Sequence, residues 1–543
     1  MSGVSPASLV SPVKLVLAEQ ARALDAEASA QWGLNPCALV EAAGRSCAEM
    51  LLQARPGLFG KSAAGQRAGN IPAIVVLAGS GNNAADALVM LRALMLRGFA
   101  GASSAWVFIT RLPGASEKTP LSEAVLAIQK LMIPVFVWDP EKAREILAGA
   151  DIIIDGIAGT GLQGSLHGAA LEMVKAAAGN TQAAKIAIDI PSGNNDAWQP
   201  GMPVFQADAT LAIEPLKLCL YTPAVRKNAG NILPVGGIFP AALVGQYQEA
   251  ELLCWENAAA RIPRVEADAY KYERGTVEIR AGSLGAAGAA KLAASGAQAA
   301  GAGLVRLIVD PSLYPILAPW ASGVMVVAGG EERFKPDAAL LGPGWGRGMD
   351  RARLLESYLP LEEQGLPLIL DADAISLAKG IIFHGNAILT PHAGEFAAYA
   401  GIPKEEILAC PAPVLRRFAK EKNACILFKS HVLYIAAPDG SLALIDGMCP
   451  ALGAGGSGDL LAGFCAAIAA RWRAIDARWR AIDAPAGHFD PYACAGAAAA
   501  LLIEAARSKE IAGRFIDPAE LACAAAAIAG RAWLSNGIRS GDE

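Results

Sequence analysis

Short apolar runs alternate with longer amphipathic stretches in the first part of the chain. The runs lie at 74–78, 105–109, 152–155 and 185–189. Between the first two, leucines recur three residues apart, which is the spacing of a helix that buries one face. Continuous apolar runs are typical of strands buried on both sides, so the pattern predicts a parallel sheet with helices on both faces.

The same pattern restarts after a turn-rich stretch at 228–245. Candidate strands follow at 277–279, 304–308, 338–341, 368–370, 387–389 and 425–428. We therefore expect two α/β domains, 1–240 and 241–543. The second is not a repeat of the first, because the motifs at the strand ends differ.

Composition and charge narrow the class of protein. A chain of 543 residues with 54% hydrophobic and 18% charged residues is globular and long enough for two or more cores. The net charge of -5 gives no electrostatic footprint for nucleic acid. The ten cysteines form no CxxC pair, and no apolar run reaches the length of a membrane span. We expect a cytoplasmic protein that binds neither nucleic acid nor membranes.

One heptad is repeated in tandem, Arg-Trp-Arg-Ala-Ile-Asp-Ala at 471–477 and again at 478–484. Seven residues make about two helical turns, so the copy either extends a helix or bulges as a loop. We interpret it as a duplication without a function of its own.

Polar and glycine-rich motifs follow the candidate strands of the first half. They are Gly-Ser-Gly-Asn-Asn at 79–83, Asp-Gly at 155–156 and Asp-Ile-Pro-Ser-Gly at 189–193. Parallel α/β sheets bind ligands at the carboxyl ends of their strands. A glycine-rich turn between a strand and a helix can cradle a pyrophosphate, and the two asparagines offer amide donors and acceptors.

In the second half, Gly-Gly-Ser-Gly-Asp at 455–459 precedes an apolar helical run. Glycines let backbone N–H groups face an anion at a helix start, and Asp459 can take a proton from an attacking hydroxyl there. A capped helix after an ordinary loop is the alternative. Further motifs follow the neighbouring strands, at 342–346, 371–374, 390–395 and Lys429. Their convergence on one edge favours a binding cleft.

The motifs of both halves, in this order, resemble those of the bifunctional NAD(P)H-hydrate repair enzymes. Gly-Pro-Gly-x-Gly, Leu-Asp-Ala-Asp, Thr-Pro-His-x-Gly-Glu and Gly-Gly-Ser-Gly-Asp are similar to the dehydratase domain, over about 250–530. The three motifs of the first half are similar to the epimerase domain, over about 10–240. The resemblance implies a Rossmann-like three-layer domain followed by a ribokinase-like α/β domain, and a role in metabolite repair.

For the dehydratase half, the resemblance implies that the 6S hydrate of NADH or NADPH is phosphorylated on its hydroxyl at the expense of ADP or ATP, with Mg²⁺, and that phosphate is then eliminated. Asp459 would be the catalytic base. Gly344 and His392 would contact the hydrate together with Asp459. The residues implied at the nucleotide are Lys429, Ser430, His431, Gly456, Ser457 and Gly458.

For the epimerase half, the resemblance implies interconversion of the 6R and 6S hydrates by proton transfer at the hydroxyl-bearing carbon, with Asp189 as the acid/base. A potassium ion would be held by Asn83, Asp155 and Ser192, oxygen ligands that suit a hard cation. The residues implied at the hydrate are Asn82, Asn83, Asp86, Gly159, Thr160, Gly161 and Gly164. The implied partners are these small molecules and, as a homo-oligomer, other copies of the chain.

Alanines at 84, 85 and 87 stand where the family motif usually has glycines. If those positions need a positive φ or a close phosphate, the methyl groups would weaken or block binding. One alternative is therefore that only the dehydratase is active and that the first domain is a decayed binding module. A small-molecule kinase is the other alternative, because such kinases share the glycine-rich turn and its aspartate.

Overall fold

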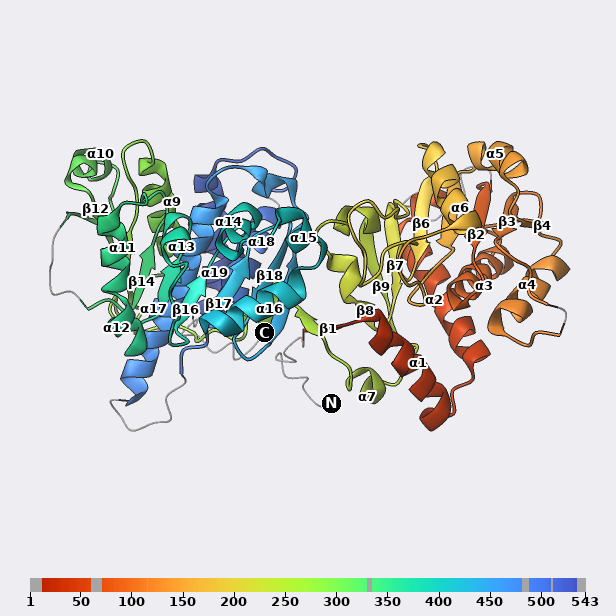
Figure 1. Ribbon diagram of the computed structural model, residues 1–543, viewed down its shortest axis with the longest axis horizontal. Helices are drawn as coiled ribbons and strands as arrows, with labels where there is room; N and C mark the ends of the chain where they lie inside the picture. Colours follow the sequence, from red (N-terminus) through yellow and green to blue (C-terminus); the bar gives the residue numbers. More distant parts are fainter. Residues whose placement is uncertain are drawn as a thin grey trace, which may run out of the picture. The chain divides into compact units, whose positions relative to one another are not determined.

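The computed structural model describes residues 12–59, 71–114, 116–329, 335–480, 488–508 and 511–534. Their contacts divide into two compact units, one of which covers Lys14–Ala250 while the other begins at Glu251. Each unit is built on its own layered arrangement of helices around a sheet (Figure 1). Within the described residues, no helix is both long and apolar enough to cross a bilayer.

The N-terminal unit contains a parallel sheet with the strand order β4-β3-β2-β5-β6-β7-β9. These strands are β2 (Ile74–Ala78), β3 (Ala105–Ile109), β4 (Val135–Val137), β5 (Ile152–Gly156), β6 (Ala184–Ile188), β7 (Ala209–Ile213) and β9 (Asn231–Val235). The order reverses between β2 and β5, as in doubly wound dinucleotide-binding folds, and such a reversal opens a crevice at the strand ends.

Helices cover both faces of this sheet, so the predicted three-layer arrangement is confirmed. Ile74, Val76 and Ala78 pack toward one helical layer, whereas Val75 and Leu77 pack toward the other. The first layer consists of α2 (Pro36–Ala54), α3 (Asn82–Leu96) and α4 (Pro120–Lys130), and the second of α5 (Pro140–Ala148) and α6 (Gly168–Gly179).

Shorter elements complete the N-terminal unit. They are β1 (Val13–Val16), α1 (Ala18–Trp32), η1 (Pro56–Phe59), β8 (Leu216–Lys217), η2 (Leu218–Tyr221), η3 (Arg226–Ala229) and α7 (Ala241–Val244). Strand β1 pairs in parallel with β8, which places α1 beside the region of Lys217. The turn-rich stretch at 228–245 contains β9, which pairs with β7.

The C-terminal unit contains strands in the order β13-β12-β11-β14-β15-β16-β17-β18-β19-β10. Their bounds are β10 (Ala250–Leu252), β11 (Thr276–Arg280), β12 (Leu304–Val309), β13 (Met325–Ala328), β14 (Ala338–Leu341), β15 (Leu368–Leu370), β16 (Ala387–Leu389), β17 (Cys425–Phe428), β18 (Val432–Ala436) and β19 (Leu442–Asp446). All six strands predicted for this half are present. The sequence pattern predicts neither β10 and β13 nor β18 and β19, and the last two form an antiparallel extension of the otherwise parallel strands.

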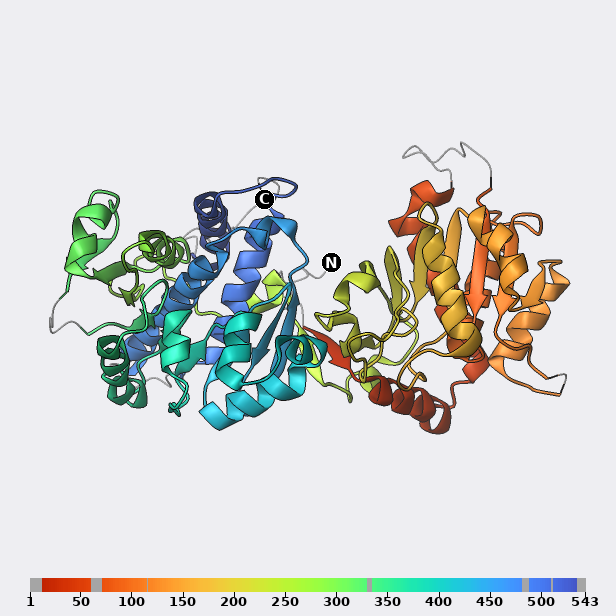
Figure 2. The same ribbon diagram turned by 45° about the horizontal axis from the view of Figure 1, so that its top comes forward.

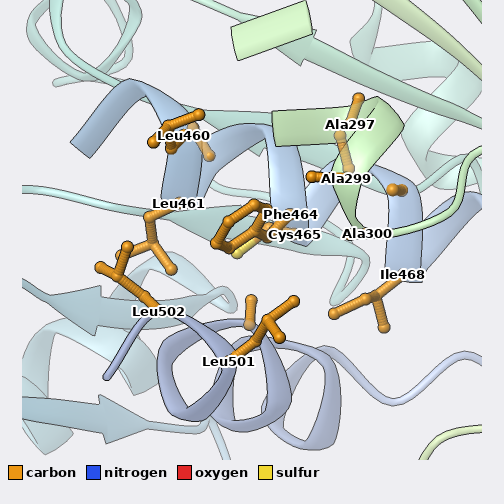
Figure 3. Close-up of a cluster of buried hydrophobic side chains, with 14 of the residues drawn as sticks. Ala297, Ala299, Ala300, Leu460, Leu461, Phe464, Cys465, Ile468, Leu501 and Leu502 are labelled. Carbon is orange, nitrogen blue, oxygen red and sulfur yellow. The ribbon is translucent and has the colours of Figure 1, made fainter. Parts of the chain in front are cut away.

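One face of these strands is covered by α8 (Trp255–Ala259), α9 (Ala287–Ala299), α17 (Ser457–Arg480), α18 (Pro491–Arg507) and α19 (Pro518–Trp533) (Figures 1 and 2). Figure 3 shows Phe464 of α17 between the alanines that end α9 and Leu501 of α18. Helices α9 and α17 pack so closely that position 463 requires glycine, because a Cβ there would lie 2.2 Å from the carbonyl oxygen of Ala293. Helix α17 runs through the first copy of the heptad and ends at Arg480. Residues 481–484 of the second copy lie outside the described residues.

Further helices pack around the other face and the edges of the C-terminal strands. They are η4 (Pro311–Leu313), α10 (Tyr314–Leu317), α11 (Met349–Glu356), α12 (Leu359–Glu363), α13 (Asp373–Leu377), α14 (Ala393–Ala400), α15 (Lys404–Ala409), α16 (Pro411–Lys422) and η5 (Pro450–Gly453). The α/β class predicted for both halves is thereby confirmed.

Candidate active sites at the strand ends

A cavity of about 690 Å³ lies at the carboxyl ends of β2, β5 and β6. Its walls come from α1, α2, the start of α3 and the loops that follow these strands. The residues implied at the hydrate that line it are Asn82, Asn83, Asp86, Gly159, Thr160 and Gly161, joined by Asp189. Gly164 is not among the lining residues, and its carbonyl accepts a hydrogen bond from the Asn195 amide.

A buried ion pair stands at the floor of this cavity. The Nζ atom of Lys217 lies 2.5 Å from Oδ1 of Asp189 and also donates to the carbonyl of Ile213 at 2.9 Å. Asp189 has a φ of 64°, a left-handed conformation that a non-glycine residue rarely adopts. Strain of this kind persists where the surroundings hold the residue in place. Here the backbone N–H of Asp189 donates a hydrogen bond to the carbonyl of Leu211, and the ion pair holds the side chain.

Asp155 at the end of β5 contacts Ser192 of the 189–193 turn, and Asn83 at the start of α3 borders Gly156 and Gly159, which follow Asp155 in the chain. Both carboxylate oxygens of Asp155 accept hydrogen bonds from Ser192, at 2.5 Å from the hydroxyl and 2.8 Å from the amide. Burial nevertheless outweighs these bonds and raises the pKa of Asp155 to about 6. The side-chain amide of Asn83 is buried and neither its oxygen nor its nitrogen has a hydrogen-bond partner. An open amide oxygen and a buried carboxylate fit a cation.

The three alanines of the first motif lie inside helix α3. Ala84, Ala85 and Ala87 are fully buried in the core between α3 and the sheet, and none has a positive φ. The methyl group of Ala87 is accommodated because residue 156 is glycine: a Cβ at Gly156 would lie 2.6 Å from that of Ala87. The substitutions therefore fit the helix, and the physical basis for a silenced first domain is removed.

The motifs in the sequence do not indicate the part of this cavity that α1 supplies. Arg22 and Asp25 lie on the inward face of α1, and the Arg22 guanidinium donates to the carbonyl of Thr160. Their only signal in the sequence is the spacing of three residues, which any solvated helix face also shows. Lys217 lies outside the motifs that the sequence pattern singles out. The structure adds its contact with Asp189.

In the C-terminal unit, Asp459 occupies the first turn of α17, the long helix behind the strands. Burial raises its pKa to about 7, Asp371 and Glu395 add to this shift, and Lys429 opposes it. A carboxyl group with this pKa exchanges protons readily near neutral pH. The same four side chains therefore form one electrostatic cluster at the ends of β15, β16 and β17.

Lys429 connects these strand ends. Its Nζ lies 2.6 Å from Oδ1 of Asp371, the carboxylate that also accepts from the Thr390 hydroxyl at 2.7 Å. Burial lowers the pKa of Lys429, but the surrounding carboxylates outweigh burial and raise it. A Cβ at Gly458 would lie 3.2 Å from Nζ, so the ammonium group lies against the start of α17. Positive charge is thus held beside the helix end that attracts anions.

His392 caps helix α14. Its Nδ1 accepts from the amides of Gly394 and Glu395 at 3.0 and 3.2 Å, while the Glu395 carboxylate accepts from the amide of His392 at 2.9 Å. This reciprocal pairing is a capping box. Because Nδ1 is an acceptor, the proton of a neutral ring is on Nε2, and the side chain is 59% exposed. Nε2 lies 3.3 Å from Oε1 of Glu395, so the N–H donor of His392 at the end of β16 stands beside that carboxylate.

The remaining predicted residues flank this cluster. Gly344, at the end of β14, has a φ of 56°, and its carbonyl accepts from the Ser283 hydroxyl at 2.8 Å. A Cβ there would lie 2.8 Å from that of Ala286, so glycine is required. Ser430 and His431 form the turn between β17 and β18, where the Ser430 hydroxyl accepts from the amide of Val432. Gly456 precedes α17 with a φ of 97°, followed by Ser457 and Gly458 at the first helical positions.

Comparison with known proteins gives matches over both units. The family described as NAD(P)H-hydrate dehydratase matches residues 277–531, and the family described as YjeF-related protein N-terminus matches residues 36–219. The chain is 30% identical over 484 residues to the bifunctional NAD(P)H-hydrate repair enzyme Nnr of Moorella thermoacetica, covering 84% of this chain and 88% of that protein.

Two further relatives match the C-terminal unit. An ADP-dependent (S)-NAD(P)H-hydrate dehydratase of Xanthomonas campestris is 35% identical over 216 residues, or 37% of this chain and 74% of that protein. A crystal structure of the ADP/ATP-dependent NAD(P)H-hydrate dehydratase from Bacillus subtilis, co-crystallised with ATP/Mg²⁺, is 26% identical with a TM-score of 0.45, covering 51% of this chain and 98% of that one.

Proposed function

The chain belongs to the family of bifunctional NAD(P)H-hydrate repair enzymes, and from this premise we propose how its two strand-end sites divide the family's two reactions. The chain is an NAD(P)H-hydrate epimerase and an ADP-dependent NAD(P)H-hydrate dehydratase. We assign the epimerase to the Rossmann-like domain at 1–240 and the dehydratase to a ribokinase-like domain at 241–543. The dehydratase assignment rests on the cluster of Asp459, Lys429 and Asp371. The epimerase assignment rests on the cavity around Asp189.

Asp459 is the base of the dehydratase. As a carboxylate it takes the proton of the hydrate hydroxyl while the hydroxyl oxygen attacks the terminal phosphoryl group of the nucleotide. The backbone N–H groups of 456–458 and the ammonium of Lys429 stabilise the charge on that group. Phosphate then leaves with the electrons of the carbon–oxygen bond, and loss of a ring proton restores the double bond of NADH or NADPH.

The other predicted residues position the two substrates. Gly344 and His392 contact the hydrate, His392 through its Nε2–H, since Nδ1 is occupied by the helix cap. Lys429, Ser430 and His431 line the nucleotide. Mg²⁺ fits as a partner of the nucleotide phosphates, because within the described residues no group of three His, Cys, Asp or Glu side chains could hold a metal. When bound, it neutralises phosphate charge.

The Asp459→Asn variant tests this assignment. Incubated with the 6S hydrate and ADP, it should bind both substrates but release NADH and phosphate at least a hundredfold more slowly, the usual scale for a general base. Asp439→Asn, in the exposed turn between β18 and β19, is the matched control and should keep the full rate. An unaffected Asp459→Asn rate would exclude this base. Accumulation of a phosphorylated product without free phosphate would instead favour a small-molecule kinase.

The epimerase site uses the cavity at the ends of β2, β5 and β6. Its volume of about 690 Å³ suits a nicotinamide nucleotide portion of the substrate. Asp189 is the acid/base, and the Lys217 ammonium balances its charge and fixes its orientation. The hydrate is contacted by Asn82, Asn83, Asp86 and the loop at 159–161. Gly164 helps to position that loop. Consumption of only the 6S form from a mixture of both epimers would exclude an active epimerase.

Potassium is the cofactor that we assign to the epimerase. The unpartnered amide oxygen of Asn83 and the buried carboxylate of Asp155 would hold it together with the Ser192 hydroxyl. Bound there, the ion supplies a fixed positive charge that offsets the carboxylate. Replacing K⁺ by tetramethylammonium should lower the epimerisation rate and the thermal stability of wild type. Asn83→Ala should lose both responses, and a K⁺ response that survives this change would exclude Asn83 as a ligand.

The choice between ADP and ATP is tested by the same dehydratase assay run with each nucleotide, and ADP is expected to support the reaction. A homo-oligomer and a cytoplasmic location stay predictions from the sequence.

A further inference from the structure

Helix α1 supplies one wall of the epimerase cavity and is held against it at two points. The amide of Ala18 donates to the Asp196 carboxylate at 2.6 Å, and the Arg22 side chain donates to the carbonyl of Thr160. Ala21, Arg22, Asp25 and Ser29 all line the cavity, at the spacing of one helical face. The helix therefore presents the Asp25 carboxyl to the same space as the pair of Asp189 and Lys217.

Epimerisation through opening of the ring, in place of proton transfer at the hydroxyl-bearing carbon itself, places two proton transfers in that space. The hydrate carries its hydroxyl on a carbon bonded to the ring nitrogen, so the ring can open at this bond. The hydroxyl loses its proton as the carbon–oxygen double bond forms, and the electrons of the carbon–nitrogen bond pass to the nitrogen, which gains a proton. Closure on the opposite face reverses both transfers. No co-reactant is consumed, but one group must accept a proton while another donates one.

We propose that Asp25 is a second catalytic residue of the epimerase, which donates the proton to the ring nitrogen while Asp189 accepts the proton of the hydroxyl. This inference rests on the epimerase function assigned above. Asp189 suits the accepting role because Lys217 balances its negative charge. Asp25 suits the donating role because burial raises its pKa; Lys217 lowers that pKa and Asp189 raises it.

Most of the other charged groups that face the cavity are committed elsewhere. Lys217 is bonded to Asp189 and to a carbonyl, and the Glu214 carboxylate accepts from the amides of Ile238 and Phe239. Arg22 is bonded to Thr160, and the lining residues of α2 are uncharged. Two carboxyl groups remain, Asp25 and Asp86. Asp86 of α3 is 8% exposed, as Asp189 is, and its Oδ1 atom has no hydrogen-bond partner, whereas Asp25 is the one that is exposed to the cavity.

The test uses the full chain with the purified 6R hydrate and ADP, after subtraction of uncatalysed epimerisation. Asp25→Asn should lower the epimerisation kcat by about 10² to 10⁴, with KM changed little, and should leave dehydration of the 6S hydrate at the wild-type rate. The wild-type epimerisation rate should fall as the pH rises through the pKa of Asp25, and this fall should disappear in the variant. Asp25→Glu should restore part of the rate. Glu19→Gln, on the exposed side of α1, should behave as wild type.

An Asp25→Asn variant that keeps kcat within a factor of about three, or that raises KM alone, would overturn the proposal. A fall of the rate with rising pH that is the same in the variant as in wild type would also overturn it. Failure of the wild type to consume the 6R hydrate would instead overturn the epimerase function itself, and this inference with it. Calorimetric binding of NADP to the Asp25→Asn chain guards against misfolding: if binding is retained and the rate is lost, the result supports the proposal.

Discussion

The ionisation of Asp459 predicts the pH dependence of the dehydratase. Its pKa of about 7 means that about a tenth of the molecules carry the carboxylate at pH 6 and about nine-tenths at pH 8. Because only the carboxylate accepts a proton, kcat should rise about tenfold between these values and level off above them. The raised pKa results mainly from burial and from the neighbouring carboxylates Asp371 and Glu395, so removing one of these charges should move the curve.

Glu395→Gln is the sharpest perturbation. The amide oxygen of glutamine can still accept from the amide of His392, so the cap of α14 is kept while one negative charge is removed. The pKa of Asp459 should fall, and the acidic limb of kcat should shift to lower pH. At pH 6 the variant should therefore retain a larger share of its plateau rate than wild type.

The assay is a single-turnover measurement of NADH formation from the 6S hydrate at saturating ADP, across pH 5.5 to 9, a range chosen to bracket a pKa near 7 by about two units. Glu405→Gln, an exposed glutamate of α15 that does not shift Asp459, serves as the control for charge removal. A wild-type limb centred near the ordinary aspartate value, or a shift to higher pH in Glu395→Gln, would refute the assignment of Asp459 as the titrating base.

Three further changes test the packing around the sites. Gly456→Ala should lower the melting temperature and the dehydratase rate, because its φ of 97° disfavours a side chain and a Cβ would lie 2.3 Å from Leu292, whereas Gly455→Ala meets nothing within 4 Å and should leave both unchanged. Gly156→Ala should lower the free energy of unfolding in urea by about 1–3 kcal/mol, because its methyl group meets that of Ala87. Adding Ala87→Gly should recover part of that stability. No recovery would show that the clash with the Asn83 carbonyl dominates. Arg471→Met should leave the chain as stable or up to about 4 kcal/mol more stable, because Arg471 is a buried cation whose Nε and Nη1 atoms have no hydrogen-bond partner. A lower melting temperature would show that the stacking of Arg471 on Trp533 outweighs the cost of burying its charge.

Much of each site could be predicted because its residues directly follow apolar runs. Asp189, Lys429 and Asp459 all stand where a strand ends or a helix begins, and the parallel sheets bring such positions to one edge. The pairing of Lys429 with Asp371 was not predictable, since it depends on which strands are neighbours. Strand order is set by long-range packing that no local pattern contains.

The missed elements had weaker signals. Strands β18 and β19 flank a Pro-Asp-Gly turn at 438–440, which is a signal for an antiparallel hairpin and not for the parallel strands that the rest of the pattern predicts. Asp25 carries no comparable mark, because a charged residue on an amphipathic helix is ordinarily solvated. Only the docking of α1, through the contact of Arg22 with Thr160, turns that charge toward the cavity.

The contact between Ala87 and Gly156 has a consequence for inheritance. A Cβ at position 156 would lie 2.6 Å from the methyl group of Ala87 and 2.9 Å from the Asn83 carbonyl oxygen. Glycine at position 87 would remove the first of these contacts and leave the second, so alanine at position 87 makes a side chain at position 156 harder to accept. The effect of a substitution at one of the two positions therefore depends on which residue already occupies the other, so the order in which substitutions arise matters. Grafting the alanine-containing helix into a relative whose strand does not end in glycine should fail for the same reason.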